Sequence, residues 1–189
     1  ADAELRRLAA VGFRGVRFNF MTHLAAAASV DEVVALTPRL KAAGLHLQVH
    51  FESGLVHRLG PVLARSAVPV VIDHMGRVDA TLGAEHADFL ALHALLANPL
   101  FHVKLSGIDR IDSKPLAAPA YAQGVVLARL LMESYPERCL WGTDWPHPNH
   151  THMPDDGALV DALVRIAPDP AQRELLLVRN PQAFYRFEH

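Results

Sequence analysis

Five short apolar runs alternate with helix-compatible stretches along this chain of 189 residues, and this alternation constrains the fold more than any other feature. The runs are rich in Val, Ile, Leu or Phe, as buried strands are, and the stretches between them repeat apolar residues at helical spacing. Strands joined by helices of this length form parallel βαβ units, so the sequence predicts an α/β fold. The strands are expected at 15–18, 45–50, 69–73, 101–105 and 139–142, and the helices at 30–43, 55–65, 84–97 and 119–134.

Two parallel architectures fit this pattern. A doubly wound sheet can be complete with five strands, whereas a TIM barrel needs eight strands and about 250 residues, so the length favours the open sheet. Against the open sheet, no strand is followed by the glycine-rich turn that binds phosphate in most doubly wound folds. Residues 155–189 predict two or three further helices and no strand, and we expect a single domain over residues 1–189.

The composition excludes several classes of protein. The 18 basic and 20 acidic side chains give a formal net charge of -2, so no overall field attracts nucleic acid or an anionic membrane surface. No apolar run approaches the roughly 18 residues of a membrane span. The segment 1–10 predicts an amphipathic helix that begins in mid-helix, rather than a signal peptide, so we expect an upstream part to be absent. The single cysteine, Cys139, cannot form an internal disulfide, which fits a reducing, cytoplasmic compartment.

Polar side chains follow each of the five predicted strands. Each of them alone would often be a surface or packing residue, but the carboxyl ends of parallel strands meet at one edge of the sheet. We therefore expect these groups to converge on one concave pocket. They are Arg17 and Asn19; His50 and Glu52; Asp73, His74 and Arg77; Lys104, Ser106 and Arg110; and Thr143, Asp144 and His147.

The residues of this pocket are compatible with two kinds of chemistry. Asp144 within reach of His74 could take a proton from water while the imidazole polarises a carbonyl group. Alternatively, both side chains could ligate zinc, which accepts imidazole and carboxylate. In either case the planar guanidinium groups of three arginines at the strand ends could bind carboxylates, so the pattern predicts a small anionic substrate.

Several segments carry a resemblance to a known family. They read VVIDHMGR at 70–77, WGTDWPHP at 141–148 and NPQAFY at 180–185, with GVRFNF at 15–20 and HMPDDG at 152–157 extending the likeness over essentially the whole chain. In this order the segments resemble the amidohydrolase-related (amidohydrolase 2) family. Within that family the chain is most similar to the branch of the 2-pyrone-4,6-dicarboxylate lactonases and their sister lactone hydrolases.

The resemblance implies a (β/α)8 TIM-barrel-like fold, here a partial barrel with about five parallel strands. It also implies hydrolysis of a small anionic lactone, such as 2-pyrone-4,6-dicarboxylate, in aromatic catabolism, with Asp144 activating water and His74 polarising the carbonyl. The lactonase branch implies no metal, whereas other relatives use zinc, which His74 and Asp144 would hold, and some are metal-dependent decarboxylases. The substrate-binding residues that it implies are Arg17, Arg77, Arg110, His50 and His23.

Three departures from the family pattern change the expectation. The His-x-His pair of the family's first strand does not precede Arg17, because the only such triplet is 150–152, so we expect the first three βα units to be absent. His23 stands where the pattern has an arginine and His50 where it has a tyrosine, which predicts a different substrate or a pocket for fewer carboxylates. A partial barrel could also be a non-catalytic remnant. Its open sheet edges predict marginal stability or a homo-oligomer.

Overall fold

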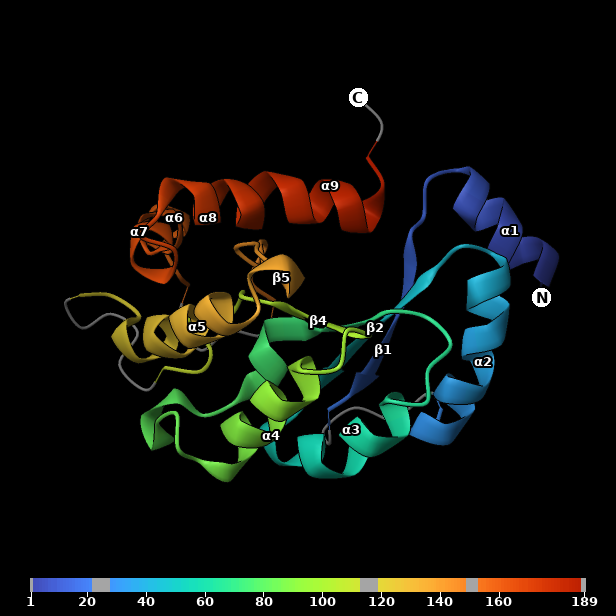
Figure 1. Ribbon diagram of the computed structural model, residues 1–189, viewed down its shortest axis with the longest axis horizontal. Coiled ribbons are helices and arrows are strands. Elements are labelled where there is room, and N and C mark those ends of the chain that lie inside the picture. The colour runs from blue at the N-terminus through green and yellow to red at the C-terminus, as the bar shows by residue number, and fades with distance from the viewer. Residues whose placement is uncertain (1, 22–27, 113–118, 149–152, 188–189) are drawn as a thin grey trace.

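Within residues 2–21, 28–112, 119–148 and 153–187, which the computed structural model describes, five parallel strands alternate with helices (Figure 1). Every strand and helix predicted up to residue 142 is present, which confirms the α/β class, and the described part of the tail holds four α-helices where two or three were predicted. The strands are β1 (Gly15–Phe20), β2 (His46–Phe51), β3 (Val70–Ile72), β4 (Phe101–Lys104) and β5 (Cys139–Leu140). The helices are α1 (Asp2–Ala10), α2 (Val30–Ala42), α3 (Val56–Leu63), α4 (Ala87–Leu96), α5 (Ala122–Ser134), α6 (Asp156–Asp161), α7 (Leu163–Ile166), α8 (Pro170–Glu174) and α9 (Asn180–Tyr185).

The order of the strands distinguishes between the two predicted architectures. The order is β1-β2-β3-β4-β5, and each neighbouring pair is parallel, with Val16 beside Leu47, Leu47 beside Val70 and Val70 beside Phe101. A doubly wound sheet reverses its strand order at a switch point, whereas a barrel adds each strand on the same side of the last. The unbroken order therefore identifies this sheet as part of a barrel wall. In Figure 1, α2, α3, α4 and α5 follow its outer side in sequence.

The two faces of the sheet differ in polarity. Leu47 and Phe51 of β2 are fully buried in the hydrophobic core beneath the helices. Because side chains alternate along a strand, Gln48 lies on the opposite, inner face. The same alternation places Arg17 of β1, which is the register partner of Gln48, and Lys104 of β4 on that inner face. Charged and amide groups therefore line the inside of the curved sheet.

Local sequence signals set the ends of the helices. Ser29 and Glu32 form a capping box at the start of α2, in which each side chain bonds to the backbone N–H of the other. Gly44 follows the end of the same helix with φ 70°, a left-handed conformation that suits glycine. In the tail, Asp169 accepts the N–H of Ala171 and Pro170 opens α8. These short-range bonds explain why the helices begin and end close to the predicted positions.

The C-terminal helix ties the end of the chain to the first strand. The Arg14 Nε donates to the Tyr185 carbonyl at 3.0 Å, and the Arg186 Nη2 donates to the Gly44 carbonyl at 2.5 Å. Figure 1 shows α9 extending from the neighbourhood of α7 toward β1. Among the described residues, β1 pairs only with β2 and β5 only with β4, so the predicted homo-oligomer stays a prediction. No helix in the described part of the chain has the length and apolar character needed to cross a membrane.

Gly124 on α5 leads to a prediction about stability. A Cβ atom at this position would lie 2.4 Å from the Ile108 carbonyl oxygen, far inside any normal contact, and a backbone group cannot rotate away. We expect Gly124→Ala to lower the free energy of unfolding by about 1–3 kcal/mol, although alanine favours helix. Urea unfolding followed by circular dichroism measures this loss. Gly54→Ala is the control, because nothing lies within 4 Å of its added Cβ, and equal midpoints for the two variants would contradict the packing argument.

Candidate active site

A left-handed turn after β3 places the first residues of the site. His74, Met75 and Gly76 have φ angles of 48°, 51° and 62°, and Arg77 follows at 54°. Left-handed backbone costs a residue with a side chain roughly 1–2 kcal/mol, so such a run persists only where packing holds it. Met75 supplies that packing, because its side chain is fully buried in the core. The turn thereby carries His74 to the carboxyl edge of the sheet.

His74 lies between Ser106 and Asp144. Its Nδ1 is 2.9 Å from the Ser106 Oγ, and its Nε2 is 3.5 Å from the Asp144 Oδ1. Gly107 makes room for the ring, since a Cβ there would lie 3.0 Å from the His74 Cβ. Burial lowers the pKa of His74. The negative charges of Asp73 and Asp144 act in the opposite direction but do not cancel this shift, so the neutral ring is favoured. Because the Asp144 carboxylate can only accept, we assign the ring proton to Nε2 and a donated hydroxyl bond from Ser106 to Nδ1.

Asp144 is held by Arg110. The Arg110 Nε and Nη2 lie 2.8 and 2.7 Å from the Asp144 Oδ2, and the Nη2 also donates to the Pro148 carbonyl at 2.9 Å. This leaves Oδ1 as the oxygen on the His74 side. The predicted approach of His74 to Asp144 is therefore present. In this structure the guanidinium of Arg110 contacts Asp144. Binding of a substrate carboxylate by Arg110 therefore stays a prediction.

Arg17 forms an ion pair with Asp73 on the inner face of the sheet. The Arg17 Nε donates to the Asp73 Oδ2 at 2.6 Å. The same carboxylate accepts from the Gln48 Nε2 at 2.8 and 3.0 Å and lies 3.1 Å from the Lys104 Nζ. Burial alone would raise the pKa of Asp73, but Lys104, His74 and Arg17 together outweigh it and lower that pKa. Asp73 is therefore an ionised carboxylate beneath the site.

His50 and Arg77 complete the described part of the site. The His50 ring stands edge-on to His74, with the ring centroids 5.1 Å apart. Both His50 ring nitrogens are buried without a hydrogen-bond partner among the described residues, and burial lowers the pKa of His50 to about 4. Burial, followed by the nearby Arg110, lowers the pKa of the half-buried Arg77 from its usual value. The remaining predicted residue, His23, lies outside the described residues.

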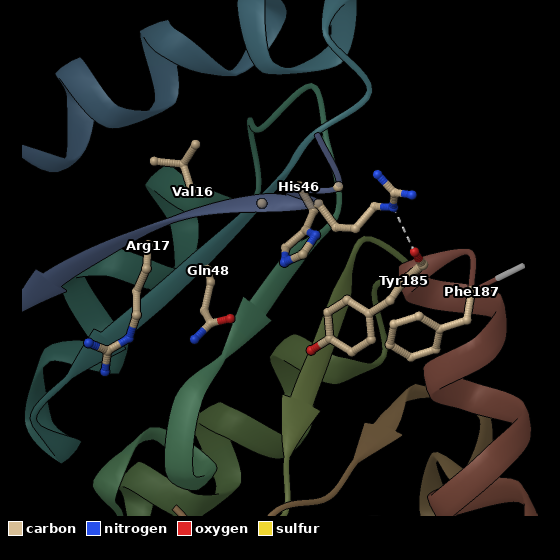
Figure 2. A pocket seen from close by; sticks show the side chains of 9 residues that line it. Val16, Arg17, His46, Gln48, Tyr185 and Phe187 are labelled. Atoms are coloured by element: carbon tan, nitrogen blue, oxygen red, sulfur yellow. Dashed lines mark hydrogen bonds between the residues drawn. The ribbon is translucent and has the colours of Figure 1, made fainter. Parts of the chain in front are cut away.

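A hollow of about 360 Å³ opens on the inner face at the other end of the strands (Figure 2). Arg17, His46 and Gln48 line it from the strands, and Tyr185 and Phe187 line it from the end of α9. Figure 2 shows Arg17 and Gln48 on this side, with Tyr185 facing them from α9. Arg17 and Gln48, which contact Asp73, also line this hollow, whereas His74 and Asp144 do not.

The donor set at His74 does not make a zinc site by itself. Structural and catalytic zinc sites use three or four protein ligands at about 2.0–2.3 Å. Among the described residues, no group of three or more His, Cys, Asp or Glu side chains is placed to hold a metal ion. The Asp144 carboxylate also accepts a hydrogen bond from the Arg110 Nε and lies 2.7 Å from its Nη2, and the positive charge of Arg110 would oppose a cation there. His74 and Asp144 supply two donors, and we assign no step of the reaction to zinc.

The inner-face histidines predict that the fold is sensitive to acid. Burial lowers the pKa values of His46, His50 and His102 from 6.5 to about 4. The unfolded chain therefore binds protons between pH 6.5 and 4 that the folded chain does not, so the stability present above pH 6.5 is lost as the pH falls through this window. Thermal unfolding at a series of pH values measures the effect. A melting temperature that stays constant from pH 7 to 4 would contradict the buried, neutral state of these rings.

The sequence predicted a role for most of this cluster but not for Lys104, Ser106, Asp73 and Gln48, and Lys104 is seen to act only through its ion pair with Asp73. Ser106 and Asp73 stand at predicted strand ends, and their parts appear only when the structure shows what they contact. Gln48 lies inside β2, where no strand-end rule points to it. The alternation of side chains along β2 was the available signal, because it places Gln48 on the same face as His50.

Comparisons with known proteins agree with this fold. The Amidohydro_2 family model, described as Amidohydrolase, matches residues 1–187. The chain is 40% identical to 2-pyrone-4,6-dicarboxylate hydrolase of Comamonas testosteroni over 192 residues, covering 98% of this chain and 63% of that protein. It is 36% identical to 4-sulfomuconolactone hydrolase of Hydrogenophaga intermedia, covering 96% of this chain and 60% of that protein. The chain thus spans less than two thirds of the length of these relatives.

Solved structures show the same fold. An Acinetobacter baumannii protein with citric acid bound superimposes with a TM-score of 0.82 at 25% identity, covering 99% of this chain and 69% of that one. An amidohydrolase of Burkholderia multivorans with bound Zn gives a TM-score of 0.73 at 22% identity, covering 97% and 71%. These neighbours extend beyond the described sheet, which agrees with a partial barrel. Because the family model matches residues 1–187, nearly the whole chain, this chain belongs to the amidohydrolase family.

Proposed function

We propose that the natural polypeptide carrying this sequence opens the ring of a small anionic lactone by hydrolysis, in the breakdown of aromatic compounds. The placement of the His74 Nε2 3.5 Å from an Asp144 carboxylate, with arginines around the pair, carries the proposal. The names of the two curated relatives, a pyrone dicarboxylate hydrolase and a sulfomuconolactone hydrolase, support a lactone as the substrate class.

In the proposed reaction Asp144 is the general base. As its Oδ1 takes a proton from water, the water oxygen attacks the lactone carbonyl carbon and a tetrahedral oxyanion forms. The Nε2–H of His74 donates to that oxyanion, since its long contact with Asp144 can be exchanged for a bond to the incoming carbonyl oxygen. The ring C–O bond then breaks, and the leaving oxygen receives the proton from Asp144. One water molecule is consumed, and the new carboxylic acid releases its proton to solvent to become a carboxylate.

The substrate's charged groups are proposed to lie on the remaining cations. Arg17 and Arg77 are proposed to hold carboxylates, whereas Arg110 forms a hydrogen bond and an ion pair with Asp144. The neutral His50 offers an N–H or a lone pair to an uncharged substrate oxygen, because its low pKa keeps the ring uncharged near neutral pH. His23 is proposed as a further substrate contact from the sequence resemblance alone. We propose a cytoplasmic location for this chemistry.

The assay follows ring opening of 2-pyrone-4,6-dicarboxylate and 4-sulfomuconolactone by ultraviolet absorbance, with and without a chelator. Turnover that survives the chelator supports hydrolysis by Asp144 and His74 without a metal. Turnover abolished by the chelator and restored by zinc would favour a zinc hydrolase. Release of CO2 in place of a ring-opened acid would identify a decarboxylase, and dicarboxylate binding without turnover would identify a non-catalytic remnant.

A further inference from the structure

The Asp73 carboxylate is the most completely bonded charged group of the inner face, yet the proposed reaction does not use it. Its side chain is only 2% exposed. It accepts from Arg17 and Gln48 and lies within ion-pair distance of Lys104. These partners come from β1, β2 and β4, while Asp73 itself follows β3. Four successive elements of the sheet therefore converge on one buried carboxylate.

The contact with Arg17 has a particular geometry. Asp73 binds the Nε of Arg17 at 2.6 Å, so it occupies the side of the guanidinium nearest the backbone. A guanidinium has a second bidentate edge, formed by its two terminal nitrogens, which matches a carboxylate. The Arg17 side chain is 45% exposed, and no other carboxylate among the described residues forms an ion pair with it. The terminal edge of Arg17 therefore faces the open side of the sheet.

Gln48 and Lys104 hold the Asp73 carboxylate in place. Gln48 donates to both oxygens of Asp73, and the Lys104 ammonium lies 3.1 Å from Oδ1, the oxygen that Arg17 does not bind. The carboxylate therefore cannot follow a rotation of Arg17 without breaking these bonds. Two cations share a single carboxylate here, so an excess of positive charge remains on the inner face. An anion that binds at Arg17 restores the balance.

We propose that Asp73, held by Gln48 and Lys104, is a positioning residue that orients Arg17 so that its terminal edge receives one carboxylate of the substrate. This inference rests on the proposed function for the identity of the bound anion, but the orientation of Arg17 is independent of turnover. Asp73 itself contacts neither substrate nor the reacting atoms.

The orientation is tested first by nuclear magnetic resonance of the wild-type protein. We expect the Nε–H signal of Arg17, assigned by its loss in Arg17→Met, to be shifted downfield and to exchange slowly with water. In Asp73→Asn the signal should move to the position of an exposed arginine. Asp31→Asn is the matched control, because Asp31 pairs with Arg65 at the surface, and it should leave the Arg17 signal in place. An exposed-type signal in the wild-type protein would overturn the proposal, even if Asp73→Asn does not fold.

Binding and kinetics test the consequence for the substrate. Benzene-1,3-dicarboxylate, a planar probe without a lactone, is titrated calorimetrically. We expect Asp73→Asn to weaken its binding about tenfold or more and to raise KM similarly, with kcat within about threefold, as loss of a charged hydrogen bond in ground-state binding predicts. In the Arg17→Met background Asp73→Asn should add less than about twofold, because the two changes act through one group.

The outcomes separate the two proposals. Equal weakening by Asp73→Asn with and without Arg17, or a fall in kcat at constant KM, would overturn the positioning role. A third outcome is an Arg17 Nε–H signal that is shifted downfield and exchanges slowly in a wild-type protein that neither binds the probe nor opens a lactone. In that case the positioning of Arg17 by Asp73 stands and the proposed function fails.

Discussion

Replacing Asp144 by asparagine is expected to lower kcat for lactone ring opening by about 10²–10⁴-fold, the usual contribution of a positioned general base. Asparagine has nearly the same shape and can still accept from Arg110, but it cannot take a proton from water. The steady-state rate with 2-pyrone-4,6-dicarboxylate measures the loss. Because the change removes a negative charge from the site, the variant should bind benzene-1,3-dicarboxylate at least as well as the wild-type protein.

Asp161→Asn is the matched control, since Asp161 ends α6 as an exposed residue. It should keep the wild-type rate. Full activity in Asp144→Asn would remove Asp144 as the base, and a loss of probe binding together with activity would point to a folding defect instead.

His74→Asn is expected to lower kcat by about 10²–10³-fold, the cost of removing one donor from a developing oxyanion. The asparagine side chain is shorter than imidazole and cannot bridge from Ser106 to the carbonyl. The kcat of Ser106→Ala should lie between the values of His74→Asn and the wild-type protein. This change removes the hydrogen bond that sets the ring proton on Nε2 but leaves the ring in place. Rates measured over a pH series are the readout.

His57→Asn provides the control for the histidine change, because His57 pairs with Asp88 on the outer side of the fold. Its rate should match the wild-type value. If Ser106→Ala left the rate and its pH dependence unchanged while His74→Asn abolished activity, the assigned tautomer would be wrong, although His74 would keep its role.

The sequence was sufficient to predict the sheet and the edge at which the site lies. The apolar runs are short and are separated by clear helical stretches, so each strand could be placed, and parallel strands necessarily bring their carboxyl ends together. The meeting of His74 with Asp144 follows from that rule, although 70 positions separate them in the printed sequence. Strand order was the missing quantity. Length favoured an open sheet and the family resemblance implied a partial barrel, and the observed pairing, without a reversal, confirms the barrel wall.

The contacts within the site depend on register and backbone conformation, which no local pattern encodes. Arg17 reaches Asp73 only because β1, β2 and β3 lie side by side in a register that places Gln48 between them. The left-handed run at 74–77 turns His74 toward Ser106, and Met75, Arg77 and His74 are residues that disfavour such a conformation. Reading each side chain by itself therefore gives the members of the site but not their partners.

Attack of water on the lactone carbonyl is tested by following a water oxygen through turnover. The natural polypeptide is incubated with 2-pyrone-4,6-dicarboxylate in water labelled with heavy oxygen, and the product is analysed by mass spectrometry. Attack of water on the lactone carbonyl predicts a ring-opened acid that carries one labelled oxygen in its new carboxyl group. A ring-opened product whose new carboxyl group lacks the label, or CO2 released from an unopened ring, would contradict attack of water on the lactone carbonyl.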